Sequence, residues 1–254
     1  MNTQERREYI LSQVYASGHV MVKDLSASMA VSEATVRRDL RALADERELE
    51  LVYGGANLAR SSDFSFRSKA MRNIEAKRII GRLAADLVLD GDQIFIDSGT
   101  TCFEMAPFMK RKRGVSVIVS SSRLAIELAD NSNLSIITLG GQYRLDRMDS
   151  VGPLAMTVLD QLRGYIAFIG SDGVSMDFGI TASDIESAHL HKLAVRNARE
   201  TILLVDHTKF FSPSLYKIAE WDVVSRLVTD QKPGPEWMEF LDSRGIEAIY
   251  PAES

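Results

Sequence analysis

Apolar positions at helical spacing mark three short segments near the start of the chain. The pattern predicts helices over residues 4–15, 22–29 and 33–45, and Gly18 ends the first of them. An alternating segment over residues 49–53 then predicts a strand, which a pair of glycines closes. Three helices followed by a short β element is the order of a winged helix.

From residue 73 onward, helical patterns alternate with short and nearly continuous apolar runs. Such runs are typical of strands in a parallel sheet that helices cover on both faces. We therefore expect a mostly parallel α/β domain in this part of the chain. The expected strands are residues 93–97, 115–119, 134–139, 165–169, 201–205 and 223–228, and the expected helices include 74–89, 123–129 and 185–198.

Composition narrows the class of protein without deciding it. The chain has 254 residues, of which 45% are hydrophobic and 26% charged, as in an ordinary globular protein. Its net charge of -5 gives no general affinity for nucleic acid, so a DNA contact must come from a local basic surface. No apolar run approaches the roughly 18 residues of a membrane helix, and no signal-peptide core is evident. We expect a cytoplasmic protein with one domain over residues 1–56, a polar linker over 57–72 and a larger domain over 73–254.

The helix expected over residues 33–45 has two chemically different faces. Ser32 is a good N-cap, and Glu33 lies in the first turn, where the helix dipole favours negative charge. At about 100° per residue, three apolar residues share one narrow arc that can pack on the preceding helices. These residues are Val36, Leu40 and Leu43.

The opposite face of this helix carries Arg37, Arg38 and Arg41. The planar guanidinium fork can bond a guanine edge with two hydrogen bonds or clamp a phosphate. Taken alone, three arginines on a helix fit a solvated surface equally well. The short helix before them, the tight break and the β element after them favour DNA binding.

A longer sequence pattern spans the second and third helices and the glycine pair. It consists of Val22, Leu25, Val31, Ser32, Thr35–Leu40, Leu43 and Gly54–Ala56. This pattern resembles the N-terminal signature of the DeoR family of bacterial sugar-metabolism repressors. The resemblance implies a winged helix-turn-helix whose third helix enters the major groove of double-stranded operator DNA, with the wing near the backbone.

The expected wing departs from the family pattern. This chain has Arg47, Leu51 and Tyr53 where family members commonly carry a glycine, an arginine and a histidine. We do not expect Leu51 to contact phosphate, and Arg47 is the candidate to replace that contact. The candidate DNA contacts are Ser32, Glu33, Thr35, Arg37, Arg38, Arg41 and Arg47.

Small polar residues follow the first strand of the larger domain. In the run Asp97-Ser98-Gly99-Thr100-Thr101, free amides at a helix start, two threonine hydroxyls and a glycine form a plausible anion cradle. The run lacks the Gly-x-x-x-x-Gly-Lys of a nucleotide P-loop. An ordinary capped turn between strand and helix explains this spacing as well.

Further polar clusters follow later strands, and the carboxyl ends of parallel strands gather at one edge of a sheet, where ligands bind. Six stretches resemble the effector domain of the same family, which is similar to ribose-5-phosphate isomerase. They are Asp97–Thr101, Gly140-Gly141-x-x-Arg144, Val151-Gly152, Phe168–Gly173, Gly179–Thr181 and Asp206-x-x-Lys209-Phe210. The resemblance implies a phosphorylated sugar or polyol with its phosphate on the loop from Ser98 to Thr101. Ser121 stands where the family usually has asparagine, which is expected to alter the preferred sugar. The candidate effector contacts are Asp97, Ser98, Gly99, Thr100, Thr101, Ser121, Gly141, Arg144, Asp172 and Lys209.

Other titratable residues point to no additional chemistry. His189 and His191 are two apart on a helix, which predicts surface histidines and no metal-ligand set. Cys102, the single cysteine, is expected to be a small, partly buried residue without a basic partner. We therefore expect neither a metal, a cofactor nor catalytic residues.

The sequence leaves three hypotheses. The first is a transcriptional repressor that binds operator DNA as a homodimer or homotetramer and senses a phosphorylated sugar or polyol. The second is a sugar-phosphate isomerase or deaminase that uses Asp97, Asp172 and Lys209 as acid-base groups. The third is a partner-binding module, which predicts no salt-dependent DNA affinity.

Overall fold

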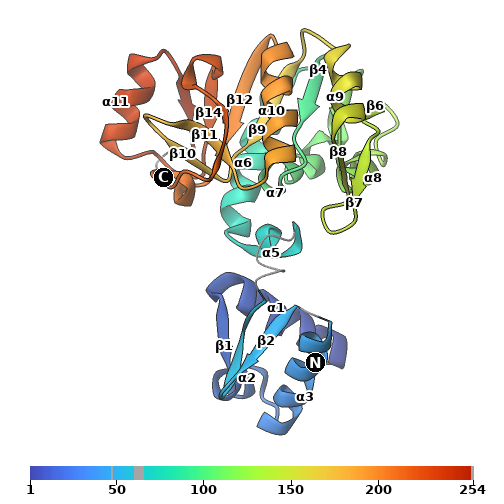
Figure 1. The fold of residues 1–254 in the computed structure, drawn as a ribbon, viewed down its shortest axis with the longest axis vertical. Helices are drawn as coiled ribbons and strands as arrows, with labels where there is room; N and C mark the ends of the chain where they lie inside the picture. Colours follow the sequence, from blue (N-terminus) through green and yellow to red (C-terminus); the bar gives the residue numbers. More distant parts are fainter. Residues whose placement is uncertain (47, 60–65, 253–254) are drawn as a thin grey trace. The chain divides into compact units, whose positions relative to one another are not determined.

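The computed structural model describes residues 1–46, 48–59 and 66–252, in two compact units, Met1–Ile74 and Glu75–Ser254. Each unit has a hydrophobic core of its own, so each is described by itself (Figure 1). Within the described ranges, no helix combines the length and the apolar character that crossing a membrane requires.

The N-terminal unit packs three helices against a three-stranded antiparallel sheet of order β1-β3-β2. The helices over residues 22–29 and 33–45 have the predicted bounds, and Ala30 turns the chain between them with a φ of 52°. The three-residue strand β1 was not predicted. The elements are α1 (Thr3–Ser17), β1 (His19–Met21), α2 (Val22–Met29), α3 (Glu33–Asp45), β2 (Leu49–Val52), β3 (Gly55–Leu58) and α5 (Phe66–Met71).

The linker expected over residues 57–72 differs from the structure at both ends. Strand β3 continues to Leu58 and pairs with both β1 and β2, so a boundary at residue 56 would divide a hydrogen-bonded strand. Helix α5 lies inside the expected linker and packs with α1, and Arg72 Nε donates to the Tyr15 carbonyl at 3.3 Å. The division into units falls after Ile74, because these contacts join the segment to the N-terminal unit.

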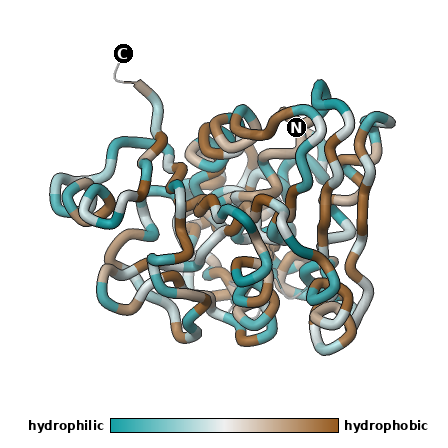
Figure 2. Tube along the Cα trace, turned by 90° about the horizontal axis from the view of Figure 1, so that it is seen from above, coloured by the Kyte–Doolittle hydropathy of each residue, from teal (hydrophilic) through white to brown (hydrophobic). Residues whose placement is uncertain are grey.

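The C-terminal unit is built on a seven-stranded, wholly parallel sheet, which confirms the predicted α/β class. The strand order is β15-β14-β12-β9-β4-β5-β6, so the winding direction reverses between β4 and β9. Figure 2 shows how hydrophobic and hydrophilic stretches alternate along the chain. The strands are β4 (Gln93–Ile96), β5 (Ser116–Val119), β6 (Ser135–Thr138), β9 (Ile166–Gly170), β12 (Glu200–Leu204), β14 (Arg226–Val228) and β15 (Glu247–Ile249).

Helices cover both faces of this sheet, because alternate strand residues point to opposite sides. Side chains of α6, α7, η1 and α8 pack on one face in a cluster with Ile94 and Val117. Side chains of α9 and α10 pack on the other face with Phe95 and Ile118. The helices are α6 (Ile74–Asp86), α7 (Thr100–Phe103), the 3-10 helix η1 (Ala106–Arg111), α8 (Ser122–Leu128), α9 (Pro153–Asp160), α10 (Ile185–Asn197) and α11 (Pro235–Ser243).

Several short elements of the C-terminal unit were not predicted. A hairpin of two strands follows β6, and a small antiparallel sheet of order β10-β11-β13 packs with α11 in a third cluster. One 3-10 turn, η2, follows β12, and another, η3, precedes β14. These elements are β7 (Gln142–Arg144), β8 (Asp149–Val151), β10 (Gly173–Ser175), β11 (Gly179–Ala182), β13 (Tyr216–Ala219), η2 (His207–Lys209) and η3 (Trp221–Val223).

Candidate nucleic-acid interface and ligand-binding edge

The start of α3 is held by two hydroxyl groups. Ser32 is the N-cap, and its Oγ accepts a hydrogen bond from the Thr35 amide at 3.2 Å. The same oxygen lies 3.0 Å from Thr35 Oγ1. Such a cap typically stabilises a helix by about 1 kcal/mol. The two predicted contacts therefore also define the first turn of the helix.

One side of α3 is anchored by the core and by a buried ion pair. Val36 and Leu40 are 0% and 1% exposed. Asp39 is 1% exposed, and its Oδ2 lies 2.9 Å from Nε of Arg6 on α1. Arg7 Nε lies 3.8 Å from the other carboxylate oxygen. Sequence reasoning missed Asp39, although its place beside the apolar arc of an arginine-rich helix was a usable signal.

The other side of α3 presents its three arginines to solvent. Arg37, Arg38 and Arg41 are all exposed, which confirms the predicted two-faced helix. Arg37 Nη2 forms an ion pair of 2.7 Å with Glu33, one turn earlier. Because both partners are about half exposed, this pair is weak and can yield to a phosphate.

The wing has little positive charge of its own. Residues 48–59 include two glutamates and neither lysine nor arginine. Tyr53 is fully exposed at the turn between β2 and β3, and Leu51 is half exposed. Tyr15 donates to Glu48 at 2.6 Å, which ties the base of β2 to α1. The predicted contact of Arg47 lies outside the described residues.

In the C-terminal unit, β4 and β9 are neighbours at the point where the strand order of the sheet reverses, and the loops that follow them meet there. We call the residues of these loops, 97–101 and 170–172, the switch-point edge. Ligands bind at such points in open α/β sheets. Asp97, only 2% exposed, joins the two loops. Its Oδ1 accepts from the Gly99 amide at 3.1 Å, and its Oδ2 accepts from the Gly170 amide at 2.9 Å.

His191 on α10 completes this junction, and its predicted surface position is wrong. It is 6% exposed, and its Nε2 lies 2.7 Å from Asp97 Oδ1. Burial alone would lower the pKa of His191, but the Asp97 carboxylate, with Asp172 and Asp149 beyond it, raises it above its ordinary value. Burial alone would raise the pKa of Asp97, and the charge and hydrogen bond of His191 hold it below its ordinary value. The missed signal was the apolar arc of α10, on which His191 lies one turn from Ala188 and Ala194.

A second network ties the β7–β8 hairpin to this edge. Ser98 Oγ donates to Asp149 at 3.0 Å. Two nitrogens of Arg144 donate hydrogen bonds to the Asp149 carboxylate at 2.8 and 2.7 Å, and the third donates to Asp184 at 2.6 Å. Arg147 also donates to Asp184, at 2.8 Å. Arg144, a predicted effector contact, is therefore already held by two carboxylates.

The remaining predicted effector residues occupy several loops at the same end of the sheet. Thr100 and Thr101 lie half buried in the first turn of α7, for which Gly99 is the N-cap. Gly141 has a φ of 150°, and a Cβ there would lie 2.5 Å from the Val151 carbonyl oxygen, so its role is in the backbone. The others are Ser121, which caps α8 through the Leu124 amide at 3.2 Å, Asp172, which accepts from Ser183 N and Oγ at 2.8 and 2.7 Å, and Lys209, half buried at the end of η2.

Two further features of this unit carry no metal or thiol chemistry. Cys102 is fully buried rather than partly buried, and burial together with the Asp97 charge raises the pKa of its thiol well above the ordinary value. Among the residues that the structure describes, no group of three histidine, cysteine or carboxylate side chains could hold a metal ion.

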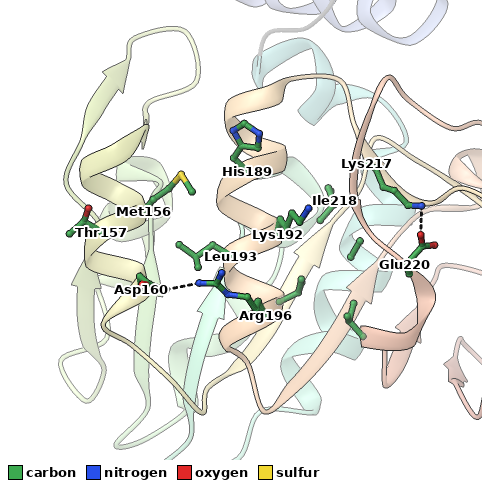
Figure 3. A pocket seen from close by; sticks show the side chains of 13 residues that line it. Met156, Thr157, Asp160, His189, Lys192, Leu193, Arg196, Lys217, Ile218 and Glu220 are labelled. Atoms are coloured by element: carbon green, nitrogen blue, oxygen red, sulfur yellow. Dashed lines mark hydrogen bonds and ion pairs between the residues drawn. The ribbon is translucent and has the colours of Figure 1, made fainter.

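A groove of about 680 Å³ lies along the outer side of α10, between α9 and β13 (Figure 3). Its floor is largely apolar, and its charged residues form local pairs: Asp160 bonds Arg196 at 2.7 Å, and Lys217 bonds Glu220. The described residues that line it include none of the predicted effector contacts. The groove is therefore separate from the switch-point edge.

An arginine-bearing helix in a winged helix-turn-helix, joined to a doubly wound α/β unit, defines a two-domain transcriptional regulator. Residues 6–62 match the DeoR-like helix-turn-helix domain, and residues 72–231 match the DeoR C-terminal sensor domain. The chain belongs to the DeoR family of transcriptional regulators, which are not enzymes.

Named relatives agree with this family over nearly their whole length. The chain is 33% identical to the lactose phosphotransferase system repressor of Lactococcus lactis, over 94% of this chain and 95% of that protein. It is 29% identical to a putative aga operon transcriptional repressor of Escherichia coli O157:H7, over 99% and 95%. Among solved structures, it is similar to ribose 5-phosphate isomerase A of Methanocaldococcus jannaschii, with 20% identity, a TM-score of 0.40 and coverage of 54% and 55%.

Proposed function

We propose that this chain represses a carbohydrate-utilisation operon by reading its operator with α3. The observation that carries the proposal is the exposed face of Arg37, Arg38 and Arg41 on a helix whose opposite side is buried and ion-paired. A rigidly held helix keeps guanidinium groups at a fixed register along the major groove. With the hydroxyl groups of Ser32 and Thr35 at its start, α3 supplies both base readers and phosphate clamps.

The proposed effector is a phosphorylated sugar or polyol bound at the switch-point edge. Its phosphate would meet the amides and hydroxyls of Ser98–Thr101, and Asp172 and Lys209 would approach its other oxygens. Asp97 and Arg144 act mainly by positioning these loops, since their polar atoms are engaged by protein groups. The relatives named for a lactose phosphotransferase system and the aga operon support a carbohydrate ligand.

Operator and effector binding are coupled in this proposal. An effector that weakens operator binding must itself bind less tightly to the DNA-bound form. Because one reading head contacts one half-site, the functional species is a homodimer or homotetramer.

Two binding experiments on the full chain test this function. Duplexes are selected from a random pool by the protein, and their affinity is measured by fluorescence anisotropy at increasing salt. We expect affinity that falls steeply with salt and a sequence preference. A panel of phosphorylated sugars and polyols is then screened for a raised melting temperature. Equal, weak affinity for every duplex would refute operator reading, and no melting shift with any compound would refute the effector class.

A further inference from the structure

Exposed apolar side chains of the C-terminal unit are concentrated in one stretch of its sequence. Half of the exposed large hydrophobic residues described in Glu75–Ser254 come from the short stretch over residues 126–158. Contiguous exposed apolar surface on a soluble protein marks an interaction site more often than chance exposure does. These residues are Ile126, Ile137, Tyr143, Leu145, Leu154 and Val158.

The two edge strands of the sheet differ in how they are protected. β15 is three residues long, begins with Glu247 and is soon followed by Pro251. β6 reads Ser-Ile-Ile-Thr and has neither a charge nor a proline. Native edge strands are usually blunted by such residues, because a bare edge pairs with another chain. The β6 edge lacks this protection.

The free backbone groups of β6 can be assigned from its pairing with β5. Ser135 N donates to the Val115 carbonyl at 2.9 Å, and Leu139 N donates to the Val119 carbonyl at 2.8 Å. Alternate residues of a strand direct their backbone groups to opposite sides. Ile136 and Thr138 therefore direct their N–H and C=O groups outward, away from β5.

Helix α9 adds an apolar flank beside this edge. Its Met156 and Asp160 line the groove toward α10, whereas Leu154 and Val158, 70% and 41% exposed, lie on the opposite flank at about 100° per residue. Ile137 of β6 pairs in register with Ile118, which packs in the same cluster as α9, so Ile137 faces the α9 side. We call Leu154, Val158, Ile137 and the outward backbone of Ile136 and Thr138 the β6–α9 surface.

We propose that two copies of this chain associate through the β6–α9 surface about a two-fold axis. The β6 edges pair antiparallel, and the α9 helices pack antiparallel across the same axis. A two-fold interface needs one surface that complements itself. A strand edge complements a second copy of itself because it carries both donors and acceptors. The apolar flank of α9 complements a second copy because apolar side chains pack against each other.

Charge favours a second copy at this surface over the other faces. Each chain carries a net charge of -5, so copies repel except where charge is absent or complementary. The side chains of the β6–α9 surface are uncharged, and antiparallel packing sets the positive start of one α9 helix dipole against the negative end of the other. The outer side of α10 instead carries His189, Lys192 and Arg196, which would face their own copies across a two-fold axis.

Sedimentation velocity of the full chain without DNA tests this surface, in two matched pairs. Thr138→Pro removes an outward donor from β6, and Ala248→Pro is its control, because Glu247 N and the Ile249 carbonyl face inward on β15. Leu154→Glu places a charge on the α9 flank, in the first turn of the helix, where a negative side chain is tolerated. Leu89→Glu is its control, because Leu89 is 68% exposed and Leu154 is 70% exposed. Circular dichroism spectra matching the wild type establish folding of each variant.

We expect Thr138→Pro and Leu154→Glu to sediment at the 28.2 kDa chain mass, while wild type and both controls sediment at twice that mass or a multiple of it. A monomeric wild type, or folded Thr138→Pro and Leu154→Glu variants that keep the wild-type mass, would overturn the proposal. This proposal rests on the proposed function, which requires an oligomer, and specifies the surface through which that oligomer forms. Because no DNA is present, this failure is distinct from a failure of operator reading.

Discussion

In each unit of this protein a buried carboxylate holds a candidate functional element in place, but the residue that pairs with the carboxylate differs. In the N-terminal unit, Asp39 of α3 pairs with Arg6 at 2.9 Å. In the C-terminal unit, Asp97 of the switch-point edge pairs with His191 at 2.7 Å. Arginine stays charged at any working pH, whereas histidine changes charge near neutrality. α3 and the switch-point edge are therefore held by different chemistry, an arginine–carboxylate pair in one and a histidine–carboxylate pair in the other.

Breaking the Asp39 anchor should have the largest effect. Asp39→Ala leaves Arg6 buried without its partner, which costs about 3–5 kcal/mol for a pair of this kind. We expect faster hydrogen exchange across α1 and α3 in the full chain, with exchange in the seven-stranded sheet unchanged. Protection of α3 equal to that of wild type would show that the pair contributes nothing.

Removing the second anchor should cost somewhat less and should depend on pH. His191→Ala leaves the Asp97 carboxylate buried without its charged partner, at a cost of about 3 kcal/mol near pH 6. Exchange protection of the β4 and β9 amides measures it. The N-terminal unit serves as the internal control, and equal protection of wild type and variant would contradict the role of His191.

The sign of the pH dependence follows from the two pKa shifts. The raised pKa of His191 means that its contribution is complete below the unfolded value of about 6.5 and is lost as pH rises through the folded value. The lowered pKa of Asp97 means that its contribution is present above about 3.9 and is lost as pH falls through its folded value. Thermal unfolding of wild type between pH 6 and 9 should show a declining stability of the C-terminal unit, which His191→Ala flattens. A wild-type stability that rises with pH in this range would reverse the assignment.

Single arginine substitutions on α3 should weaken DNA binding without changing stability. Arg37→Ala or Arg38→Ala should cost about 1–3 kcal/mol of affinity for a selected duplex where that arginine reads a base. Where the arginine contacts a phosphate, its replacement should instead weaken binding to all duplexes and lower the salt slope by about one unit. Anisotropy titrations on selected and scrambled duplexes separate the two roles, and unchanged binding in both variants would remove these residues from the interface.

The smallest effect concerns the exposed pair of Glu33 and Arg37. Glu33→Gln removes an i,i+4 ion pair worth about 0.3–0.5 kcal/mol and frees the guanidinium. We expect nearly unchanged stability and slightly tighter binding to DNA, because a negative charge leaves the interface. A large loss of affinity would instead give Glu33 a direct base contact.

The predictable parts of this fold are those in which local rules and tertiary packing agree. The bounds of α2 and α3 follow from the Ser32 cap of α3, the break at Ala30 and the helical spacing of apolar residues. Six strands of the parallel sheet were predicted because they are continuous apolar runs. The strands that were missed, such as β1, β10 and β15, are three or so residues long and have no periodicity to detect.

The candidate sites were harder to predict where they depend on distant partners. The exposed arginines of α3 follow from spacing alone. Asp39 and Arg6 are 33 positions apart, and Asp97 follows strand β4 whereas His191 lies on helix α10, so neither pair has a local signature. A histidine on a helix is expected to face solvent, and His191 departs from that expectation because a buried carboxylate partner, Asp97, holds it inside.

The central claim is that the arginine face of α3 binds DNA, and one anisotropy titration tests it most directly. The triple variant Arg37→Ala, Arg38→Ala, Arg41→Ala is compared with the double variant Lys110→Ala, Arg111→Ala, which removes positive charge from the other unit. We predict that the triple variant stays folded and loses both its affinity for a selected duplex and most of its salt dependence, while the double variant binds like wild type. A folded triple variant with wild-type affinity would contradict the account.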